Sequence, residues 1–199
     1  MPELLVPEIV PASVERWADV CELLGGDGDL GCWCQAWRGR DAAARATGET
    51  RPETLRRQLE GGPPSPGYLA YLEGRPVGWA GVGIRTETPR LLRSRTIPAV
   101  DDSAVRSIGC FRVRPGFRRR GVASALLHGV VEAARRADAP GVEAYPIDPA
   151  GRRIDVGLAF VGIAAMFDSE GFQRVRETAA RSAGLPRILV RLDLKARHE

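Results

Sequence analysis

Lysine is almost absent from this chain of 199 residues. Lys195 is the only one, so 28 of the 29 basic residues are arginine. Glycine (23) and proline (15) are frequent as well, and this combination is typical of a GC-rich genome rather than of a surface selected for arginine. The net charge of +4 is small for a nucleic-acid-binding protein and suits a pocket for a polyanionic small molecule equally well.

Cysteine and histidine are also scarce. The four cysteines are Cys21, Cys32, Cys34 and Cys110. One residue separates Cys32 from Cys34, which is not the C-x2-C spacing of a zinc knuckle, and both histidines lie far away in the sequence. The number and spacing of the four cysteines do not suit a disulfide framework either. We therefore expect no metal site and free thiols in a reducing cytoplasm.

Long apolar runs and targeting signals are missing too. The longest nearly uncharged stretch, residues 156–167, is far shorter than the ~20 residues that cross a bilayer. The start, Met1-Pro2-Glu3, does not resemble a signal peptide. With 44% hydrophobic and 27% charged residues, the chain can bury a core. We expect one domain over residues 1–199, located in the cytoplasm and not bound to a membrane.

Periodicity and turn residues predict a mixed α/β order of elements. The expected strands cover residues 4–10, 68–72, 77–84, 105–113, 142–147, 172–175 and 185–194. The expected helices begin at Ser13, at the capping box Thr50-x-x-Glu53, at Val122 and at Val156, and residues 86–102 read as a loop. This alternation favours one α/β domain without internal repeats.

The most informative stretch is Val113-Arg-Pro-Gly-Phe-Arg-Arg-Arg-Gly-Val-Ala-Ser124. A strand ends, a basic loop follows, and a long helix starts at once. Such a helix start presents unpaired backbone N–H groups, which bind phosphate oxygens well. Gly121 lets the backbone approach a ligand closely. The stretch is neither a Walker loop nor a dinucleotide fingerprint.

Two motifs resemble those of the GCN5-related N-acetyltransferases. One is Arg118-x-x-Gly121-x-Ala123 after Val113-x-Pro115, and the other is Ala165-Met-Phe-Asp-Ser-Glu-Gly-Phe172 about fifty residues later. The resemblance covers most of the chain. It implies an α/β fold with a mixed sheet flanked by helices and strands splayed at the acetyl-CoA site. It also implies metal-free acetyl transfer from acetyl-CoA to a primary amine, by direct attack in a ternary complex.

The resemblance also assigns the cofactor site. Backbone amides of residues 119–124 would bind the pyrophosphate, and three arginines would supply positive potential. Main-chain groups of residues 111–113 would meet the pantetheine arm, and Phe167 would pack against it. The implied cofactor residues are Phe111, Arg112, Val113, Arg118, Arg119, Arg120, Gly121, Val122, Ala123, Ser124 and Phe167.

The chain departs from the family where proton transfer is expected. Phe167 stands where many members have a tyrosine that protonates the leaving thiolate. Counting by alternation, the strand positions that face the same side as Val113 are 107, 109 and 111, and none is a base. Tyr145 and Glu143 become the catalytic candidates, with a packing aromatic and a solvated strand residue as the respective alternatives.

The acceptor candidates are Trp33, Trp37, Trp79 and Asp148. The family builds one acceptor wall near the first two, although two tryptophans four residues apart suit a core equally well. The expected partner is a small-molecule or peptide amine, with a homodimer as an option and no nucleic acid. A non-catalytic acyl-CoA sensor on the same fold is the main alternative, and a nucleic-acid-binding module ranks last because acids interrupt the arginines along the chain.

Overall fold

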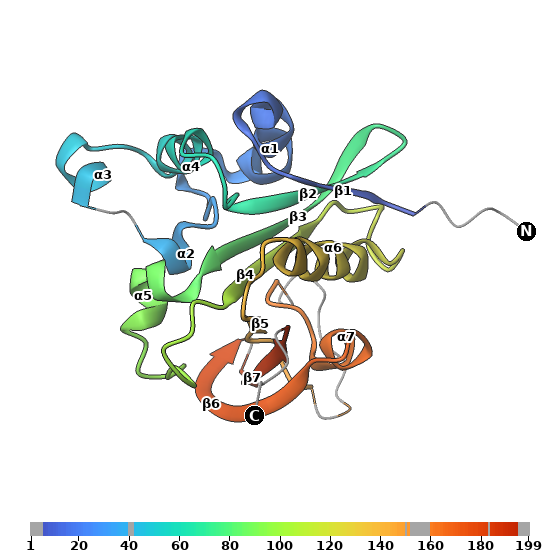
Figure 1. Cartoon of the computed structure of the whole chain (residues 1–199). Coiled ribbons are helices and arrows are strands. Elements are labelled where there is room, and N and C mark those ends of the chain that lie inside the picture. Colours follow the sequence, from blue (N-terminus) through green and yellow to red (C-terminus); the bar gives the residue numbers. More distant parts are fainter. Residues whose placement is uncertain (1–5, 40–41, 150, 152–159, 183, 195–199) are drawn as a thin grey trace, which may run out of the picture.

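One seven-stranded sheet organises the chain, in the order β1-β2-β3-β4-β5-β7-β6. The computed structural model describes residues 6–39, 42–149, 151, 160–182 and 184–194 (Figure 1). The strands are β1 (Glu8–Pro11), β2 (Gly67–Leu72), β3 (Arg75–Ile84), β4 (Arg106–Val113), β5 (Gly141–Ala144), β6 (Gln173–Ser182) and β7 (Leu185–Asp193). The α-helices are α1 (Trp17–Leu24), α2 (Gln35–Arg38), α3 (Ala42–Thr47), α4 (Arg51–Glu60), α5 (Pro89–Leu92), α6 (Val122–Arg136) and α7 (Ala164–Ser169). The predicted mixed α/β sheet is confirmed.

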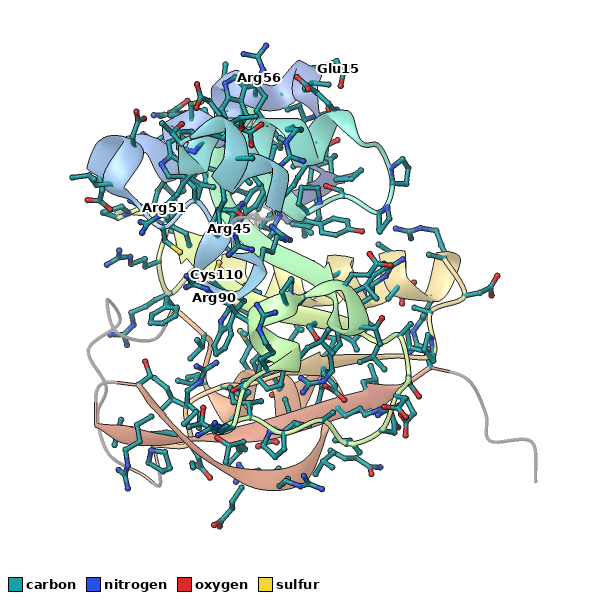
Figure 2. All side chains as sticks on the ribbon, turned by 90° about the vertical axis from the view of Figure 1, so that its left-hand side faces the viewer. Glu15, Arg45, Arg51, Arg56, Arg90 and Cys110 are labelled. Atoms are coloured by element: carbon teal, nitrogen blue, oxygen red, sulfur yellow. The ribbon has the colours of Figure 1, made fainter. Side chains whose placement is uncertain are left out.

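Helices cover both faces of the sheet (Figure 1), and Figure 2 shows the side chains from the side that lies on the left in Figure 1. On one face, α6 buries its apolar stripe, with Leu126 and Val130, against β2, β3 and β4 together with Phe167 of α7. On the other face, α1 and α4 pack with Trp79 and Leu69. Alternation along β2 explains the division, because Ala70 belongs to the first core and Leu69 to the second.

The helix starts follow the sequence signals. The Thr50 side chain accepts a hydrogen bond from the Glu53 amide, and the Glu53 carboxylate accepts one from the Thr50 amide at 2.7 Å, so the predicted capping box is present. Helix α6 begins after Gly121, which has φ of +77° in the left-handed region. A glycine is well suited there, because side chains make that conformation costly.

Strands β4 and β5 are splayed. They pair in parallel only from Arg106–Val142 to Ile108–Ala144. Beyond Ile108, β4 continues along β3 without pairing with β5, and the Phe111 amide on its freed edge donates to the Phe160 carbonyl. The splay that the resemblance implied is confirmed, and it positions the site described below.

A bulge interrupts β4 at the same place. Gly81 of β3 pairs with Cys110 and Val82 pairs with Ile108, so Gly109 is an extra residue on β4. The bulge reverses the alternation, and Cys110 therefore comes to the same face as Ser107. The prediction that residues 107 and 109 share a face with Val113 is wrong for this reason, whereas Phe111 does lie in the same core as Val113.

Several boundaries differ from the sequence predictions. The expected loop over 86–102 contains a 3-10 turn (Arg85–Glu87) and α5. Of the helix expected from Val156, the described part is α7, which begins at Ala164; residues 160–163 are not helical, and 152–159 lie outside the described residues. Strand β6 runs to Ser182 rather than 175. For residues 86–102 and for β6, a short polar pattern predicted less order than tertiary pairing supplies.

Candidate active site

A large cavity of about 800 Å³ opens beside the end of β4 and the start of α6. Its wall brings together nine of the eleven residues that the resemblance assigned to the cofactor. They are Phe111, Arg112, Val113, Arg118, Arg119, Gly121, Val122, Ala123 and Ser124. The volume lies within the range of small-molecule and cofactor sites. The first-turn amides of α6 supply donors for an anion at one end.

The three loop arginines differ in their positions. Arg118 and Arg119 line the large cavity, and Arg118 Nε donates to the Val113 carbonyl at 3.1 Å. The Arg120 guanidinium lies 5.7 Å from the centre of the Phe117 ring and is outside the cavity wall. Two arginines, rather than the three expected, therefore line this cavity.

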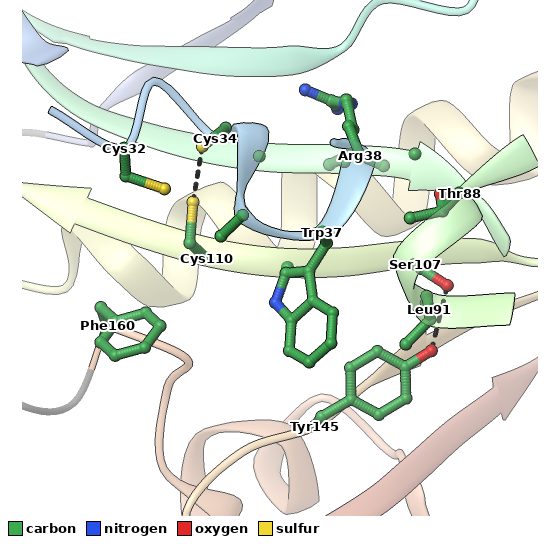
Figure 3. Close-up of a pocket in the computed structure, with 15 residues that line it drawn as sticks. Cys32, Cys34, Trp37, Arg38, Thr88, Leu91, Ser107, Cys110, Tyr145 and Phe160 are labelled. Carbon is green, nitrogen blue, oxygen red and sulfur yellow. Dashed lines mark hydrogen bonds between the residues drawn. The ribbon is translucent and has the colours of Figure 1, made fainter. Parts of the chain in front are cut away.

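A small cavity of about 60 Å³ lies on the other side of the splay. It is bounded by α2, by β3 and β4 and by Tyr145 (Figure 3). Trp37 packs against the bulge, because a Cβ atom on Gly109 would lie 3.0 Å from its ring. The walls are mainly apolar, with Trp37, Leu91 and Val82, and no carboxylate contributes among the described lining residues.

The two cavities meet at a shared wall. Five residues line both, and they are Cys32, Cys34, Ala36, Cys110 and Phe160. The wall stands where β4 leaves β5. A group held in the large cavity and a group held in the small one would therefore border the same five residues.

The Phe111 amide, expected to meet a bound thioester, already has a partner. Its N–H donates to the Phe160 carbonyl at 2.5 Å, and the Ile147 N–H donates to the Gly162 carbonyl at 3.0 Å. Residues 160–163 thus bridge β4 and the segment that follows β5. An acyl carbonyl could bind the Phe111 amide only if Phe160 released it.

Tyr145 and Glu143 form a buried polar network. Arg85 Nη1 donates to Tyr145 Oη at 2.6 Å, and the Tyr145 hydroxyl donates to Glu143 Oε2 at 3.2 Å. The Glu143 side chain is 1% exposed and pairs with Arg85 (3.7 Å) and Arg191 (3.4 Å). Burial raises the pKa of Glu143, against the opposing effect of both arginines. Burial, and then the charge of Glu143, raises the pKa of the Tyr145 phenol, which stays neutral.

This network changes the roles expected of both residues. Glu143 lines neither cavity and is not a solvated strand residue, so its carboxylate stabilises the interior and orients Tyr145. Tyr145 lines only the small cavity, and its hydroxyl points toward Ser107 rather than toward the shared wall (Figure 3). Its single proton is donated to Glu143, which leaves none for a departing thiolate.

Three further site predictions change as well. The Phe167 ring is fully buried between Phe111 and Phe172, and a Cβ atom on Gly162 would lie 2.7 Å from it. Gly162 lines the large cavity and Phe167 does not, so this ring belongs to the core. Trp79 is fully buried and lines neither cavity. Asp148 also lines neither and pairs with Arg174 at 2.8 Å.

The two remaining tryptophans separate. Trp37 lines the small cavity, as an acceptor residue would. Trp33 lines the large cavity instead, stacks on Trp17 at 5.8 Å and donates to the Gly28 carbonyl at 2.8 Å. Trp33 precedes α2 with a left-handed φ of +45°, so the two tryptophans do not share one helix face.

Sequence reasoning missed the shared wall. It treated Cys32, Cys34 and Cys110 as ordinary free thiols, and all four cysteines are indeed free. Two of these residues lie in the segment where the resemblance placed an acceptor wall, and the third lies on the motif strand. The presence of cysteines in both the expected acceptor wall and the motif strand was the sequence signal that could have indicated the shared wall. In the described part of the chain, no group of three or more metal-ligating side chains is assembled.

The sequence profile of the Acetyltransferase (GNAT) family matches residues 33–149. This range contains α2 to β5, and with them the basic loop and most of the residues of both cavities. The chain belongs to the GNAT acetyltransferase family. Acetyl transfer from acetyl-CoA is thereby established as the general activity of its family. Comparison with curated protein sequences gives no significant match.

Solved structures with the same fold are distant in sequence. The histone acetyltransferase HPA2 and related acetyltransferase from Corynebacterium glutamicum is 16% identical with a TM-score of 0.58, covering 98% of this chain and 99% of its own. YncA from Salmonella typhimurium, solved with its cofactor acetyl-CoA, is 18% identical with a TM-score of 0.54 and covers 98% and 97%. The NatC complex bound to Gag peptide and CoA is 13% identical with a TM-score of 0.55, and the match covers 95% of this chain and 99% of the NatC chain. These similarities show the GNAT fold.

We expect Arg118→Ala to weaken acetyl-CoA binding about tenfold, since a charge-assisted contact to a phosphate contributes ~1.5 kcal/mol or more. Binding of pantetheine, which lacks the pyrophosphate, should stay unchanged. Isothermal titration of both ligands measures the difference. Arg120→Ala is the matched control, because this neighbouring arginine lies over Phe117 outside the cavity. Equal weakening of both ligands by Arg118→Ala would place its action elsewhere.

We expect Tyr145→Phe to lower the free energy of unfolding by about 1–3 kcal/mol, because Arg85 and Glu143 each lose a buried partner. Turnover per folded enzyme should change by less than about threefold if the hydroxyl is not the proton donor. Denaturant unfolding and CoA-thiol release measure the two effects, with Tyr68→Phe on β2 as control. A ten- to thousandfold loss of turnover would restore Tyr145 as the donor.

Proposed function

We propose that this protein transfers the acetyl group of acetyl-CoA to a primary amine by direct attack in a ternary complex. The observation that carries the proposal is the wall shared by the two cavities. Direct attack requires donor and acceptor to be bound at once with the reacting atoms in contact. Two cavities lined by the same five residues would hold donor and acceptor side by side, so no intermediate carried by the enzyme is needed.

The residues present fit the cofactor. A Cβ atom on Gly121 would meet nothing within 4 Å, so open space lies against the start of α6. Arg118 and Arg119 stand beside that space and would neutralise a pyrophosphate. Phe111, Arg112 and Val113 extend the same wall toward Cys110, along which a pantetheine arm would lie. The bound cofactor would supply an activated acyl group.

The small cavity indicates an acceptor amine attached to an apolar group. Its walls of Trp37, Leu91 and Val82 favour aromatic or aliphatic contact, and no carboxylate among the described lining residues would hold a polycation. Burial there favours the neutral amine, which is the form that attacks a thioester. We include small molecules and peptide N-termini as acceptors.

The cellular setting is part of the proposal. Within the described residues, no helix has both the length and the apolar character to cross a bilayer. All four cysteines are free, which suits a reducing compartment, and we propose the cytoplasm. A homodimer stays a prediction, which sedimentation of the full chain would decide.

The test is amine-dependent release of CoA thiol, followed by mass spectrometry of the product. We expect phenethylamine and a dipeptide with an apolar first residue to be acetylated, and spermidine to be a poor acceptor. Turnover of spermidine alone would overturn the apolar acceptor class but not acetyl transfer. Binding of acetyl-CoA with no amine-dependent thiol release would overturn the transfer.

The second candidate is the non-catalytic acyl-CoA sensor. It is favoured by the absence of proton donors among the residues first expected: Phe167 is in the core, and the Tyr145 proton is held by Glu143. A sensor would bind acetyl-CoA and release no thiol with any of the three amines. The same assay therefore separates the two functions.

A further inference from the structure

We infer that Cys34 is a catalytic residue of the proposed transfer: it takes the proton from the attacking amine and passes it to the departing sulfur of CoA. The inference rests on the proposed function. It assigns a proton carrier to a site in which Tyr145, Glu143 and Phe167 do not serve as one.

The position of Cys34 suits both halves of this task. It belongs to the shared wall, so it lines the cavity of the acyl donor and the cavity of the acceptor. Figure 3 shows the side chains of Cys34 and Cys110 pointing toward each other at one end of the small cavity, with Tyr145 at the other end. A proton carrier between amine and thioester has to touch both substrates, and this wall is where both meet.

Hydrogen bonds prepare the Cys34 sulfur to hold negative charge. Trp79 Nε1–H donates to Cys34 Sγ at 2.9 Å, and the two sulfurs of Cys34 and Cys110 are 2.7 Å apart. Because an indole N–H can only donate, Cys34 is the acceptor on that side. With Cys34 as the thiolate that the inference assigns, the Cys110 thiol is the donor of the sulfur–sulfur contact. This arrangement also explains why Trp79 is fully buried without touching either cavity.

The surrounding charges favour the same ionisation state. The groups that act on Cys34 are the Cys110 thiol, the Arg38 guanidinium and, less strongly, Arg112. Arg38 has one buried nitrogen, Nη1, without a hydrogen-bond partner among the described residues, and Asp27 lies 3.9 Å from Arg112. The hydrogen bond from Cys110, followed by Arg38 and Trp79, lowers the pKa of Cys34 in spite of burial. The same contact, with burial, raises the pKa of Cys110, which stays a thiol and also faces Cys32.

The backbone holds the sulfur at this place. Cys34 has φ of +55° and Trp33 has φ of +45°, two successive left-handed residues just before α2. Such conformations cost free energy in non-glycine residues, and they persist where the surrounding structure fixes them. Gly81 makes the necessary room, since a Cβ atom there would lie 2.6 Å from Cys34 Sγ.

The step balances without any other reactant. The amine nitrogen forms the C–N bond with the acyl carbon while its proton moves to the Cys34 thiolate. The C–S bond to CoA breaks with its electron pair on sulfur, and the proton then passes from Cys34 to that sulfur. The products are the amide and CoA thiol, and Cys34 returns to the thiolate form.

The first test needs no turnover. The full chain is alkylated with iodoacetamide over a range of pH, and modification of each cysteine is followed by peptide mass spectrometry. We expect Cys34 to react at lower pH than Cys21, whose thiol pKa is raised by burial on α1. Acetyl-CoA should protect Cys34, and Trp79→Phe should shift its reaction to higher pH. A Cys34 profile at or above that of Cys21, unaffected by Trp79→Phe, overturns the inference.

The second test measures catalysis with phenethylamine. We expect Cys34→Ser to lower kcat about 100-fold, within the range for loss of a proton-transfer group. The affinity for acetyl-CoA should stay within about twofold. In wild type, we expect kcat to rise with pH as Cys34 ionises and as the amine loses its proton. In Cys34→Ser, the rise due to Cys34 should disappear, and only the rise due to the amine should remain. Cys21→Ser is the matched control and should keep wild-type rates.

The outcomes separate the inference from the proposed function. Undiminished kcat in folded Cys34→Ser overturns the inference and leaves acetyl transfer standing. An acetyl adduct on Cys34, found after incubation with acetyl-CoA alone, overturns it in favour of a covalent carrier. If wild type acetylates none of the amines, the proposed function and the catalytic role fall together, whereas the alkylation profile still reports how Cys34 ionises. If Cys34→Ser does not fold, the inference is tested with Trp79→Phe, which keeps Cys34. In that variant, the rise of kcat that follows Cys34 ionisation must move to higher pH.

Discussion

Replacing Gly121 with glutamate is expected to weaken acetyl-CoA binding by at least on the order of 100-fold while the fold is retained. Two costs combine at this position. A non-glycine residue with φ of +77° is strained by ~1–2 kcal/mol, and a carboxylate at the start of α6 would occupy the place of the pyrophosphate. Because nothing lies within 4 Å of a Cβ atom there, the new side chain displaces no packed group. Isothermal titration measures the affinity.

Gly116→Glu is the matched control for this change. Gly116 lies in the same loop, has φ of +81° and also has open space around a Cβ atom, but it is outside the wall of the large cavity. It adds the same strain and the same charge away from the pyrophosphate site. We expect near wild-type affinity. Unchanged affinity in Gly121→Glu, or equal losses in both variants, would contradict the assignment of the loop.

Replacing Arg85 with methionine is expected to lower the free energy of unfolding by about 3 kcal/mol at neutral pH. Arg85 is 2% exposed and binds Tyr145, the Ile97 carbonyl and Glu143. Its loss leaves the buried Glu143 carboxylate with Arg191 as its remaining ion pair. Removing one partner of a buried pair costs ~3–5 kcal/mol, and Arg191 keeps the effect near the lower end. Denaturant unfolding measures the change.

The destabilisation should shrink in acid. Burial raises the pKa of Glu143 in the folded state, and loss of Arg85 raises it further. The folded state then binds the proton more tightly than the unfolded chain, so stability is lost as the pH rises through the folded pKa. Relative to wild type, Arg85→Met should therefore be less destabilised at about pH 5 than at about pH 8.

Arg174→Met is the control, because this arginine also pairs with acidic side chains but lies at the surface. Arg174 pairs with Asp148 (2.8 Å) and Asp168 (2.9 Å) on the surface, where half of its side chain is exposed. Exposed pairs contribute ~0–1 kcal/mol, so we expect a small effect at both pH values. A loss for Arg85→Met no larger than this would show that the buried network does not stabilise the fold.

The cofactor end of the site was predictable because its signals are local. A strand end, a basic loop, Gly121 and a helix start follow one another within twelve residues, and each dictates the backbone of the next. The capping box at Thr50 was predictable for the same reason. In both cases, neighbouring residues supply the hydrogen bonds that define the structure.

The shared wall was not predictable in this way. The Gly109 bulge reverses the alternation of β4, and only pairing with β3 decides that one residue is left over. That reversal brings Cys110 to Cys34, which is 76 positions away in the sequence. The buried position of Glu143 was not predictable either, since the arginines that pair with its carboxylate come from β7 and from the segment after β3. Periodicity gives the face of a strand but not its distant partners.

The central claim is that donor and acceptor meet at the wall of Cys34, Cys110 and Phe160 and react directly. Initial rates of CoA-thiol release, with acetyl-CoA and phenethylamine both varied, test it most directly. A ternary complex predicts double-reciprocal lines that intersect, together with N-acetylphenethylamine as the product. Parallel lines, or thiol release that does not depend on the amine, would contradict direct transfer at this wall.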